Sequence, residues 1–417
     1  MDIADFSLEI LMLSLGITIF LHFVFVRKLV FSLLDPWLLL FFNQVMILSV
    51  VIYAFLTSNI LNQHFFYFIV SWFSFVLGLK LFKNDSTLKS YTAKTIITKF
   101  VTHYSLKIYL TIFCINAVVI FSLMGIPLFS GKSRTISDYS NMGTGFGLLF
   151  YLNWGLQEII KLLSLKIWLI DKKRNIGLSA LFFIVVFNVL NGGSRAVYLD
   201  IILYFGLGTF YFKKFKNITI PTPMIFKYAL FLLPFLILFS FVSAVSTGYE
   251  SNVFFALIKR TIGTAEGPFY YFIKNSYEGF SGLNLISYHL SGILPYFGYV
   301  DKNAIDLGVN LTAYSDLNFG TVGYGPNPTI YVIGHIAFGS FGFIYCFIIG
   351  ALLSFLRYRF KANFFIWMLL NYLATTLISD GTLMFLTIFY ILLISPVFLF
   401  LLVLSEKPNK FINLSLK

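Results

Sequence analysis

The sequence has few charged residues and almost no cysteine. Only 11% of its 417 residues are charged, whereas a soluble domain averages about 25%. Hydrophobic residues make up 59% of the chain, and the mean hydropathy is +0.86. These values exclude a water-soluble fold. The two cysteines, Cys114 and Cys346, both lie in apolar runs, which argues against a disulfide framework or a cysteine metal site.

Several catalytic motifs are also missing. The chain has no GxxxxGK[ST] phosphate loop, no HExxH zinc motif and no GxSxG serine elbow. It also lacks a closely spaced aspartate pair that could chelate a divalent ion. We therefore expect no metal and no cofactor, so that any chemistry on a diphosphate would depend on arginine.

The abundant basic residues show a pattern along the chain. A net charge of +13 can indicate nucleic-acid binding, but membrane proteins also collect Lys and Arg in their cytoplasmic loops. If the N-terminus lies outside, 21 of the 30 basic residues fall in cytoplasmic segments. The sequence therefore predicts no nucleic-acid partner, an outer N-terminus and a cytoplasmic C-terminus.

Long apolar runs predict an all-α, polytopic membrane protein, since a spanning helix needs about 20 mostly apolar residues. We expect one transmembrane domain over residues 1–417, with about 11 spans. The expected spans are 5–26, 37–57, 65–82, 106–126, 146–170, 177–192, 195–212, 225–245, 328–350, 363–379 and 383–404.

One outer loop, residues 246–327, is much longer than the others. It is too apolar for a disordered linker, and loops of this length are commonly functional. We expect it to form short amphipathic helices at the membrane surface.

The segment NGGSRAVYLD, residues 191–200, is the strongest candidate for a phosphate site. Ser194 can cap the following helix, and Gly192 and Gly193 allow a ligand to approach the backbone. Helix N–H groups and the Arg195 guanidinium would then bind one anion together. Tyr198 belongs to the same candidate set. The alternative is a glycine turn with an arginine that extends to the membrane interface.

Two further arginines lie in outer loops. Arg260 shares a helix face with Gly263 and Gly267, which would leave its guanidinium uncovered. It could equally contact lipid headgroups. Arg134 is a candidate for substrate binding, although Asp138 could pair with it at i+4.

His335 is an ionisable residue within an expected span, which makes it a functional candidate by default. Asn327 can cap that helix, with its N-terminus facing outward, and Tyr331 shares the His335 face. A neutral histidine hydrogen-bonded within the bundle is the alternative. Activation of an acceptor needs a base on the same side, and Glu266 and Asp316 are favoured among the outer carboxylates. Glu158 and Lys161, in the fifth span, should neutralise each other.

The layout and several local motifs resemble the Wzy-like polymerases of O-antigen and capsule repeat units. The resemblance covers nearly the whole chain and rests on GGSR at residues 192–195, LIKR at residues 257–260, the long outer loop and a late PNP…FGSFG element. Members of that family often carry a glutamate shortly before FGxxG. This chain reads YVIGHIAFGSFG there.

The resemblance implies a metal-independent membrane glycosyltransferase of the GT-C type in the bacterial cytoplasmic (inner) membrane. It would transfer a growing glycan from undecaprenyl diphosphate to a new lipid-linked repeat unit, in the synthesis of lipopolysaccharide, capsule or another polysaccharide. Arg195 and Arg260 would stabilise the diphosphate leaving group. Its partners would be undecaprenyl-diphosphate-linked oligosaccharides, membrane lipids, a chain-length regulator and a flippase. A glycan ligase, a lipid-linked sugar flippase and a membrane O-acyltransferase remain alternatives.

Overall fold

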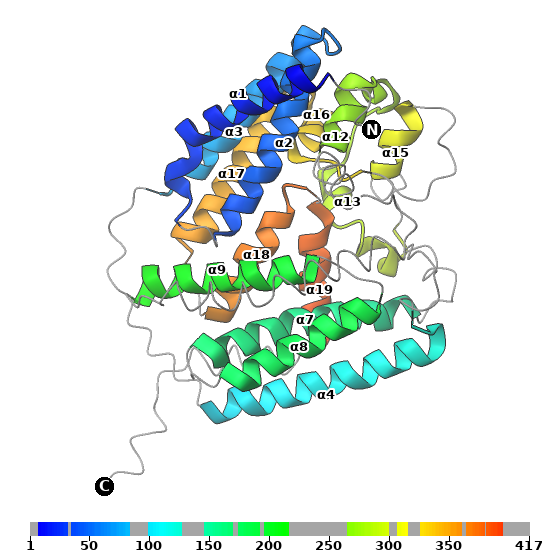
Figure 1. Ribbon diagram of the computed structural model, residues 1–417. Helices are drawn as coiled ribbons and strands as arrows, with labels where there is room; N and C mark the ends of the chain where they lie inside the picture. The colour runs from blue at the N-terminus through cyan, green and yellow to red at the C-terminus, as the bar shows by residue number, and fades with distance from the viewer. Residues whose placement is uncertain are drawn as a thin grey trace. The chain divides into compact units, whose positions relative to one another are not determined.

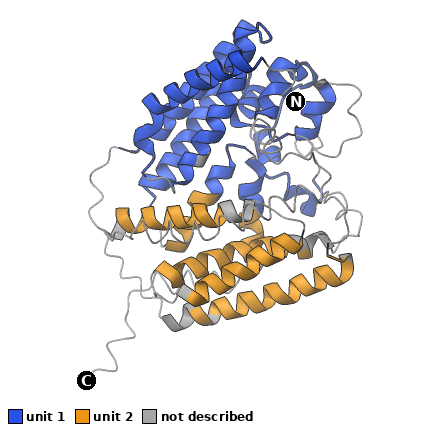
Figure 2. Cartoon of the chain, viewed as in Figure 1, with its two compact units in different colours: residues 1–85, 252–360, 373–386 blue, residues 86–251, 361–372, 387–417 orange. Residues whose placement is uncertain are grey.

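The computed structural model describes residues 7–31, 35–83, 99–126, 146–169, 174–191, 196–216, 265–299, 307–315, 326–360, 364–379 and 381–394. Within these ranges the protein is helical and has no strand, as the sequence predicts. The chain divides into two compact units (Figure 2). Unit 1 comprises Met1–Asp85, Asn252–Phe360 and Leu373–Leu386, and unit 2 comprises Ser86–Ser251, Lys361–Tyr372 and Thr387–Lys417. Since a compact unit need not fold alone, the single domain expected from the sequence stays a prediction.

Four helical segments of the described chain are long and apolar enough to cross a membrane. By length and composition these are Leu8–Leu29, Pro36–Leu56, Ser105–Leu123 and Ile330–Tyr358, of which the last folds back on itself at Gly339 and is not one straight helix. Several long apolar helices indicate a membrane protein. The other expected spans that the structure describes coincide with helices that are more polar or shorter, and the expected span 225–245 lies outside the described residues. The number of 11 crossings therefore stays a prediction.

Helix α1 (Leu8–Val26) shows the burial pattern of a membrane helix. Its inward face is formed by Ser14, Thr18 and His22, together with Val26. Its outward face exposes large apolar side chains, such as Phe20 at 65%. A soluble helix has the opposite arrangement, because water solvates its polar face. Lipid explains the apolar exterior of α1. The Ser14 and Thr18 hydroxyls donate to carbonyls of their own helix, and His22 also accepts from Trp72 of α3.

Unit 1 is built around a four-helix bundle (Figure 1) of α1, α2 (Pro36–Leu56), α3 (Asn62–Lys80) and α17 (Gly342–Tyr358). Trp72 Nε1 of α3 donates to His22 Nε2 of α1 at 3.3 Å, while the Phe82 backbone N–H donates to Ser354 Oγ at 3.2 Å. These pairings make α1, α3 and α17 parallel, with α2 antiparallel to them. The C-terminal ends of the three parallel helices therefore meet at one end of the bundle.

That end carries a buried ion pair. Arg357 donates from its two terminal nitrogens to the two oxygens of Asp35, at 2.8 and 2.6 Å. Asp35 also accepts from the Trp37 backbone N–H at 3.0 Å, which caps α2. The guanidinium carbon lies 4.2 Å from the centre of the Trp37 ring. Both oxygens of the carboxylate are thus used to join α17 to the start of α2.

Helix α17 packs very closely on α3 through two glycines. A Cβ on Gly78 would overlap the backbone around Phe347 and Ala351, and one on Gly350 would overlap the Phe75 carbonyl. Small residues that let helix backbones approach are the usual basis of helix association in membranes.

The expected ninth span, 328–350, is wrong as a single helix. The chain instead forms α16 (Ile330–Phe338), a 3₁₀ turn η6 (Gly339–Phe341) and α17. Cys346 Sγ lies 3.6 Å from the Ile330 carbonyl, and a Cβ on Gly342 would overlap the Gly334 backbone. These contacts make α16 and α17 an antiparallel hairpin, which turns at Gly339 with φ +56°.

The N-terminus of the expected ninth helix also differs from the prediction. The cap residue is Thr329, without a side-chain cap hydrogen bond, rather than Asn327. The Ile330 backbone N–H donates instead to the Ile378 carbonyl at 3.1 Å. The hairpin reverses the direction of α16 relative to α17, so the N-terminus of α16 points away from the end of unit 1 at which α17 begins. The side of the membrane that this N-terminus faces stays a prediction.

The described part of the long loop forms short helical turns, as the sequence predicts. They are α12 (Glu266–Pro268), the π turn η3 (Phe269–Ile273), η4 (Ser276–Gly279), α13 (Leu285–His289), η5 (Leu294–Phe297) and α15 (Leu307–Ser315). His289 anchors α13 to the helices: its Nδ1 donates to the Gly381 carbonyl at 3.0 Å, and its Nε2 lies 3.1 Å from the Tyr345 hydroxyl. Gly381 begins α19 (Gly381–Ile394).

Unit 2 contains α4 (Lys99–Met124), α7 (Phe146–Leu169), α8 (Arg174–Leu190) and α9 (Ala196–Lys216), together with the start of α18 (Phe364–Thr376). Figure 1 shows α4, α7 and α8 running side by side. Gly177 permits close packing of α8, since a Cβ there would lie 2.7 Å from the Ser164 carbonyl oxygen of α7. Aromatic rings of α9 and α18 stack, with the Phe210 and Trp367 centroids 5.9 Å apart.

Candidate functional site

In unit 1, the long loop and the α16–α17 hairpin bring a histidine and a tyrosine together. The Tyr271 hydroxyl, in the π turn η3, lies 2.8 Å from His335 Nδ1. The Nε2 of His335 has no hydrogen-bond partner among the residues that the structure describes. Burial, and to a smaller extent the neighbouring Tyr277, raises the pKa of the Tyr271 phenol, which therefore stays protonated. One ring nitrogen is thus oriented by the protein while the other is available for chemistry.

Aromatic rings hold the His335 imidazole in place. Its centroid lies 4.6 Å from the Tyr67 ring and 5.6 Å from the His64 ring, both nearly perpendicular to it. Edge-to-face packing of this kind restricts the rotation of a ring. The His64 side chain is almost fully buried, and its Nδ1 has no hydrogen-bond partner in the described part of unit 1. We define His335, Tyr271, His64 and Tyr67 as the histidine–tyrosine cluster.

Tyr331 connects this cluster to the bundle core. Its side chain is completely buried, and its hydroxyl donates to Gln44 Oε1 of α2. The Tyr67 hydroxyl donates to the Tyr331 carbonyl at 2.9 Å. Tyr331 therefore holds the cluster against α2 and α3. The sequence predicted it as a substrate-binding residue. A fully buried side chain cannot contact substrate in this conformation.

Glu266 and Asn327 lie at the margin of the same region. A Cβ on Gly267 would overlap the Asn327 carbonyl, so α12 meets the chain just before α16. Glu266 begins α12 and is half-buried, and Asn327 is exposed. Tyr271 follows Glu266 by five residues. The structure thus places Glu266, Asn327, Tyr331 and His335 in one region of unit 1.

The other predicted site residues cannot be placed in the same way. Those that lie outside the described residues are Arg134, Gly192, Gly193, Ser194, Arg195, Arg260 and Asp316. Tyr198 belongs to α9, and its side chain is likewise not described.

Unit 2 contains a second polar cluster, centred on α7. Lys161 Nζ lies 2.6 Å from Glu158 Oε1 and 3.5 Å from Asp200 Oδ2 of α9. The Tyr204 hydroxyl donates to Glu158 Oε2 at 2.6 Å, and the Tyr204 ring stacks on Tyr372 at 4.3 Å. The predicted pairing of Glu158 with Lys161 is confirmed. Because Asp200 joins them, the cluster holds two acidic groups and one basic group.

Sequence reasoning missed the partners that His335 acquires. Tyr271 is 64 residues away in the chain, and no local pattern connects the two. His64 could have been noticed, since it is one of only five histidines and lies beside an apolar run. No sequence feature distinguishes Tyr67 and Gln44 from the other polar residues of the expected spans, so they could not be predicted.

Among the described residues, no group of three or more His, Cys, Asp or Glu side chains converges to hold a metal ion. No family model matches the chain, and neither does any curated protein or solved structure. Function must therefore be argued from the residues themselves.

Proposed function

We propose that the protein is a membrane glycosyltransferase that polymerises lipid-linked oligosaccharide repeat units. The observation that supports this proposal most directly is the oriented imidazole of His335. An imidazole with one nitrogen hydrogen-bonded and the other accessible has the arrangement of a general base. In our assignment Nδ1–H donates to the Tyr271 hydroxyl oxygen, which leaves the Nε2 lone pair for the acceptor.

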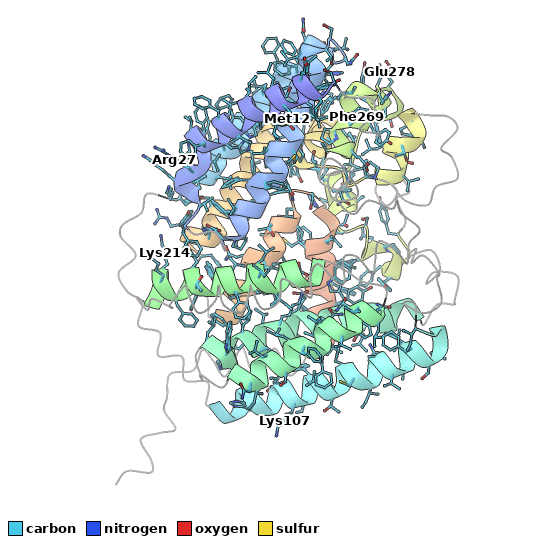
Figure 3. The ribbon with its side chains drawn as sticks, in the orientation of Figure 1. Met12, Arg27, Lys107, Lys214, Phe269 and Glu278 are labelled. Atoms are coloured by element: carbon cyan, nitrogen blue, oxygen red, sulfur yellow. The ribbon has the colours of Figure 1, made fainter. Side chains whose placement is uncertain are left out.

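The positions of the charges support an outer-face reaction. Arg27 lies at one end of the unit 1 bundle, while Phe269 and Glu278 lie at the other (Figure 3). The helix ends that carry Arg27, Lys80 and Arg357 meet at the first end. Under the positive-inside rule this end faces the cytoplasm. The histidine–tyrosine cluster then faces outward, where an undecaprenyl-diphosphate-linked glycan would be used.

The proposed reaction is a displacement at the anomeric carbon. His335 Nε2 takes the proton of an acceptor sugar hydroxyl, and the hydroxyl oxygen attacks the anomeric carbon of the donor glycan. The bond from that carbon to the diphosphate oxygen breaks, and the electron pair leaves with the diphosphate. Arg260, which belongs to unit 1 like His335, supplies positive charge for this leaving group. Glu266 is the alternative base.

The test is glycan length in cells that carry variants of this chain, with protein level measured by immunoblot. His335→Ala should lower the polymerisation rate about 10²–10⁴-fold, the usual contribution of a general base, so single repeat units should accumulate. Arg260→Ala should give the same product pattern. Tyr271→Phe should weaken polymerisation, while Tyr299→Phe, which changes an exposed phenol, should leave it unchanged.

The outcomes separate the competing functions. Normal polymer from a normally expressed His335→Ala protein would show that His335 is not the base, and the proposed site would then be wrong. Polymer that forms but is no longer attached to its final carrier would indicate a ligase. Repeat units retained on the cytoplasmic face would indicate a flippase.

A further inference from the structure

The end of unit 1 opposite the histidine–tyrosine cluster gathers basic side chains from separate parts of the chain. Arg27 and Lys28 follow α1, Lys80 ends α3, and Lys83 comes three residues later. The Lys83 ammonium donates a hydrogen bond to the Lys28 carbonyl, which joins the ends of α1 and α3. We call Lys28, Lys80 and Lys83 the lysine cluster. It exists only because α1 and α3 are parallel.

The lysine cluster has more positive charge than the nearby carboxylate can balance. Asp35, an acidic residue at this end, already accepts from both terminal nitrogens of Arg357 and from the Phe31 and Trp37 backbone N–H groups. None of the three lysines forms an ion pair with an acidic side chain in the part of the chain that the structure describes. Among the described residues, the cluster therefore has no acidic side chain as a counter-ion.

Burial and the neighbouring positive charges both act on the pKa of the Lys83 ammonium. Its pKa is lowered by burial first, and then by the positive charges of Lys28, Lys80 and Arg357. Burial without a counter-charge favours the neutral amine. An anion at this position would oppose both effects and raise the pKa of Lys83.

We propose that the lysine cluster binds the phosphate headgroup of an anionic phospholipid at the membrane surface. The cluster follows α1, a helix long and apolar enough to span, so its ammonium groups lie where a span ends and headgroups begin. Basic clusters at the ends of membrane helices attract anionic lipids. The phosphate would accept hydrogen bonds from the lysine ammonium groups and bridge the ends of α1 and α3. This inference does not depend on the proposed glycosyltransferase activity.

Lipid retention by the purified full-length protein tests the proposal. The protein would be taken from nanodiscs of phosphatidylcholine with phosphatidylglycerol, and retained lipids counted by native mass spectrometry. The wild type should retain phosphatidylglycerol selectively. The double variant Lys28→Gln/Lys83→Gln should bind it about 30-fold more weakly. Each basic residue near the surface contributes about 1 kcal/mol to the binding of anionic lipid, and the variant removes two of them. Lys107→Gln, which removes an exposed lysine of α4 in unit 2 (Figure 3), is the matched control.

Two further measurements distinguish loss of lipid binding from loss of structure. Lys28→Arg/Lys83→Arg keeps the charge and should retain the lipid. Retention should fall as pH rises through the lowered pKa of Lys83, because the neutral amine no longer attracts phosphate. Lipid binding should raise that pKa, which NMR of ¹³C-methylated lysines measures. The Lys107→Gln protein should show the same pH profile as the wild type.

Three results would overturn the proposal. The first is equal retention of phosphatidylcholine and phosphatidylglycerol by the wild type. The second is undiminished retention by a folded Lys28→Gln/Lys83→Gln protein. The third is binding of inorganic phosphate that is strong enough to displace the lipid, which would identify a site for a soluble anion instead.

Discussion

Asp35 and Arg357 form a buried ion pair that joins two helices of the unit 1 bundle. The two side chains are 0% and 1% exposed and are separated by 322 residues in the chain. Their contacts join the start of α2 to the end of α17. Along the sequence Arg357 is only one of several basic residues between apolar runs, and no local pattern connects it with Asp35.

We expect Arg357→Met to destabilise the protein by about 3–5 kcal/mol, because it leaves a buried carboxylate without its partner. Asp35→Asn combined with Arg357→Gln should lose less, since the amide oxygen can still cap α2. Unfolding by denaturant in detergent micelles measures both. Arg359→Gln, an exposed position two residues later, serves as control and should change stability by less than about 0.5 kcal/mol. Equal losses at positions 357 and 359 would contradict the buried-pair interpretation.

The sequence identifies His335 as a candidate residue but does not identify the residues that contact it. An imidazole in an apolar run is costly unless it has partners, which made His335 a candidate before its surroundings were known. Its partners come from two other elements, Tyr271 in η3 and the His64 and Tyr67 rings in α3. Neither their identity nor the burial of Tyr331 follows from spacing along one helix.

At the element scale, the hairpin of α16 and α17 is the main departure from the sequence prediction. Apolar composition alone predicts one continuous span over 328–350, since no residue in that range is charged. The chain turns because Gly339 adopts a positive φ and because Gly334 and Gly342 let two helices meet at their backbones. Glycines can equally continue a membrane helix, so only the tertiary contact decides between the two.

The hairpin predicts a sharp difference between two glycine substitutions. Gly342→Ala places a methyl group where the Gly334 backbone and the Tyr67 hydroxyl already lie. Overpacking costs about 1–3 kcal/mol even where side chains can move, and here backbone must move. Gly16→Ala meets nothing within 4 Å on the exposed face of α1 and should be neutral or stabilising by up to about 1 kcal/mol. Thermal midpoints of the two purified proteins give the comparison. Similar midpoints would mean that the hairpin is not packed as described.

For the molecule as a whole, the orientation in the membrane is the prediction on which the proposed function depends. In a variant without Cys114 and Cys346, a cysteine at Ser281 should react with an impermeant thiol reagent added to intact cells. A cysteine at Arg359 should react only after the cells are opened. Both positions are exposed in unit 1. The reason is the concentration of basic side chains at the Arg359 end. Labelling of Arg359→Cys from outside would reverse the orientation and place His335 in the cytoplasm.

The sequence by itself indicated a lipid environment rather than water, the helical class and most helix positions. Apolar run length and charge spacing are local properties that a bilayer imposes directly. It also identified His335 and the Glu158–Lys161 pair as polar residues within apolar runs. Tertiary structure alone decided the α16–α17 hairpin, the Tyr271–His335 contact, the addition of Asp200 to the α7 cluster and the meeting of Lys28 with Lys83. Each of these depends on which helices are parallel and where glycines let them touch. Such pairings join residues tens to hundreds of positions apart, and no local pattern of hydrophobicity encodes them.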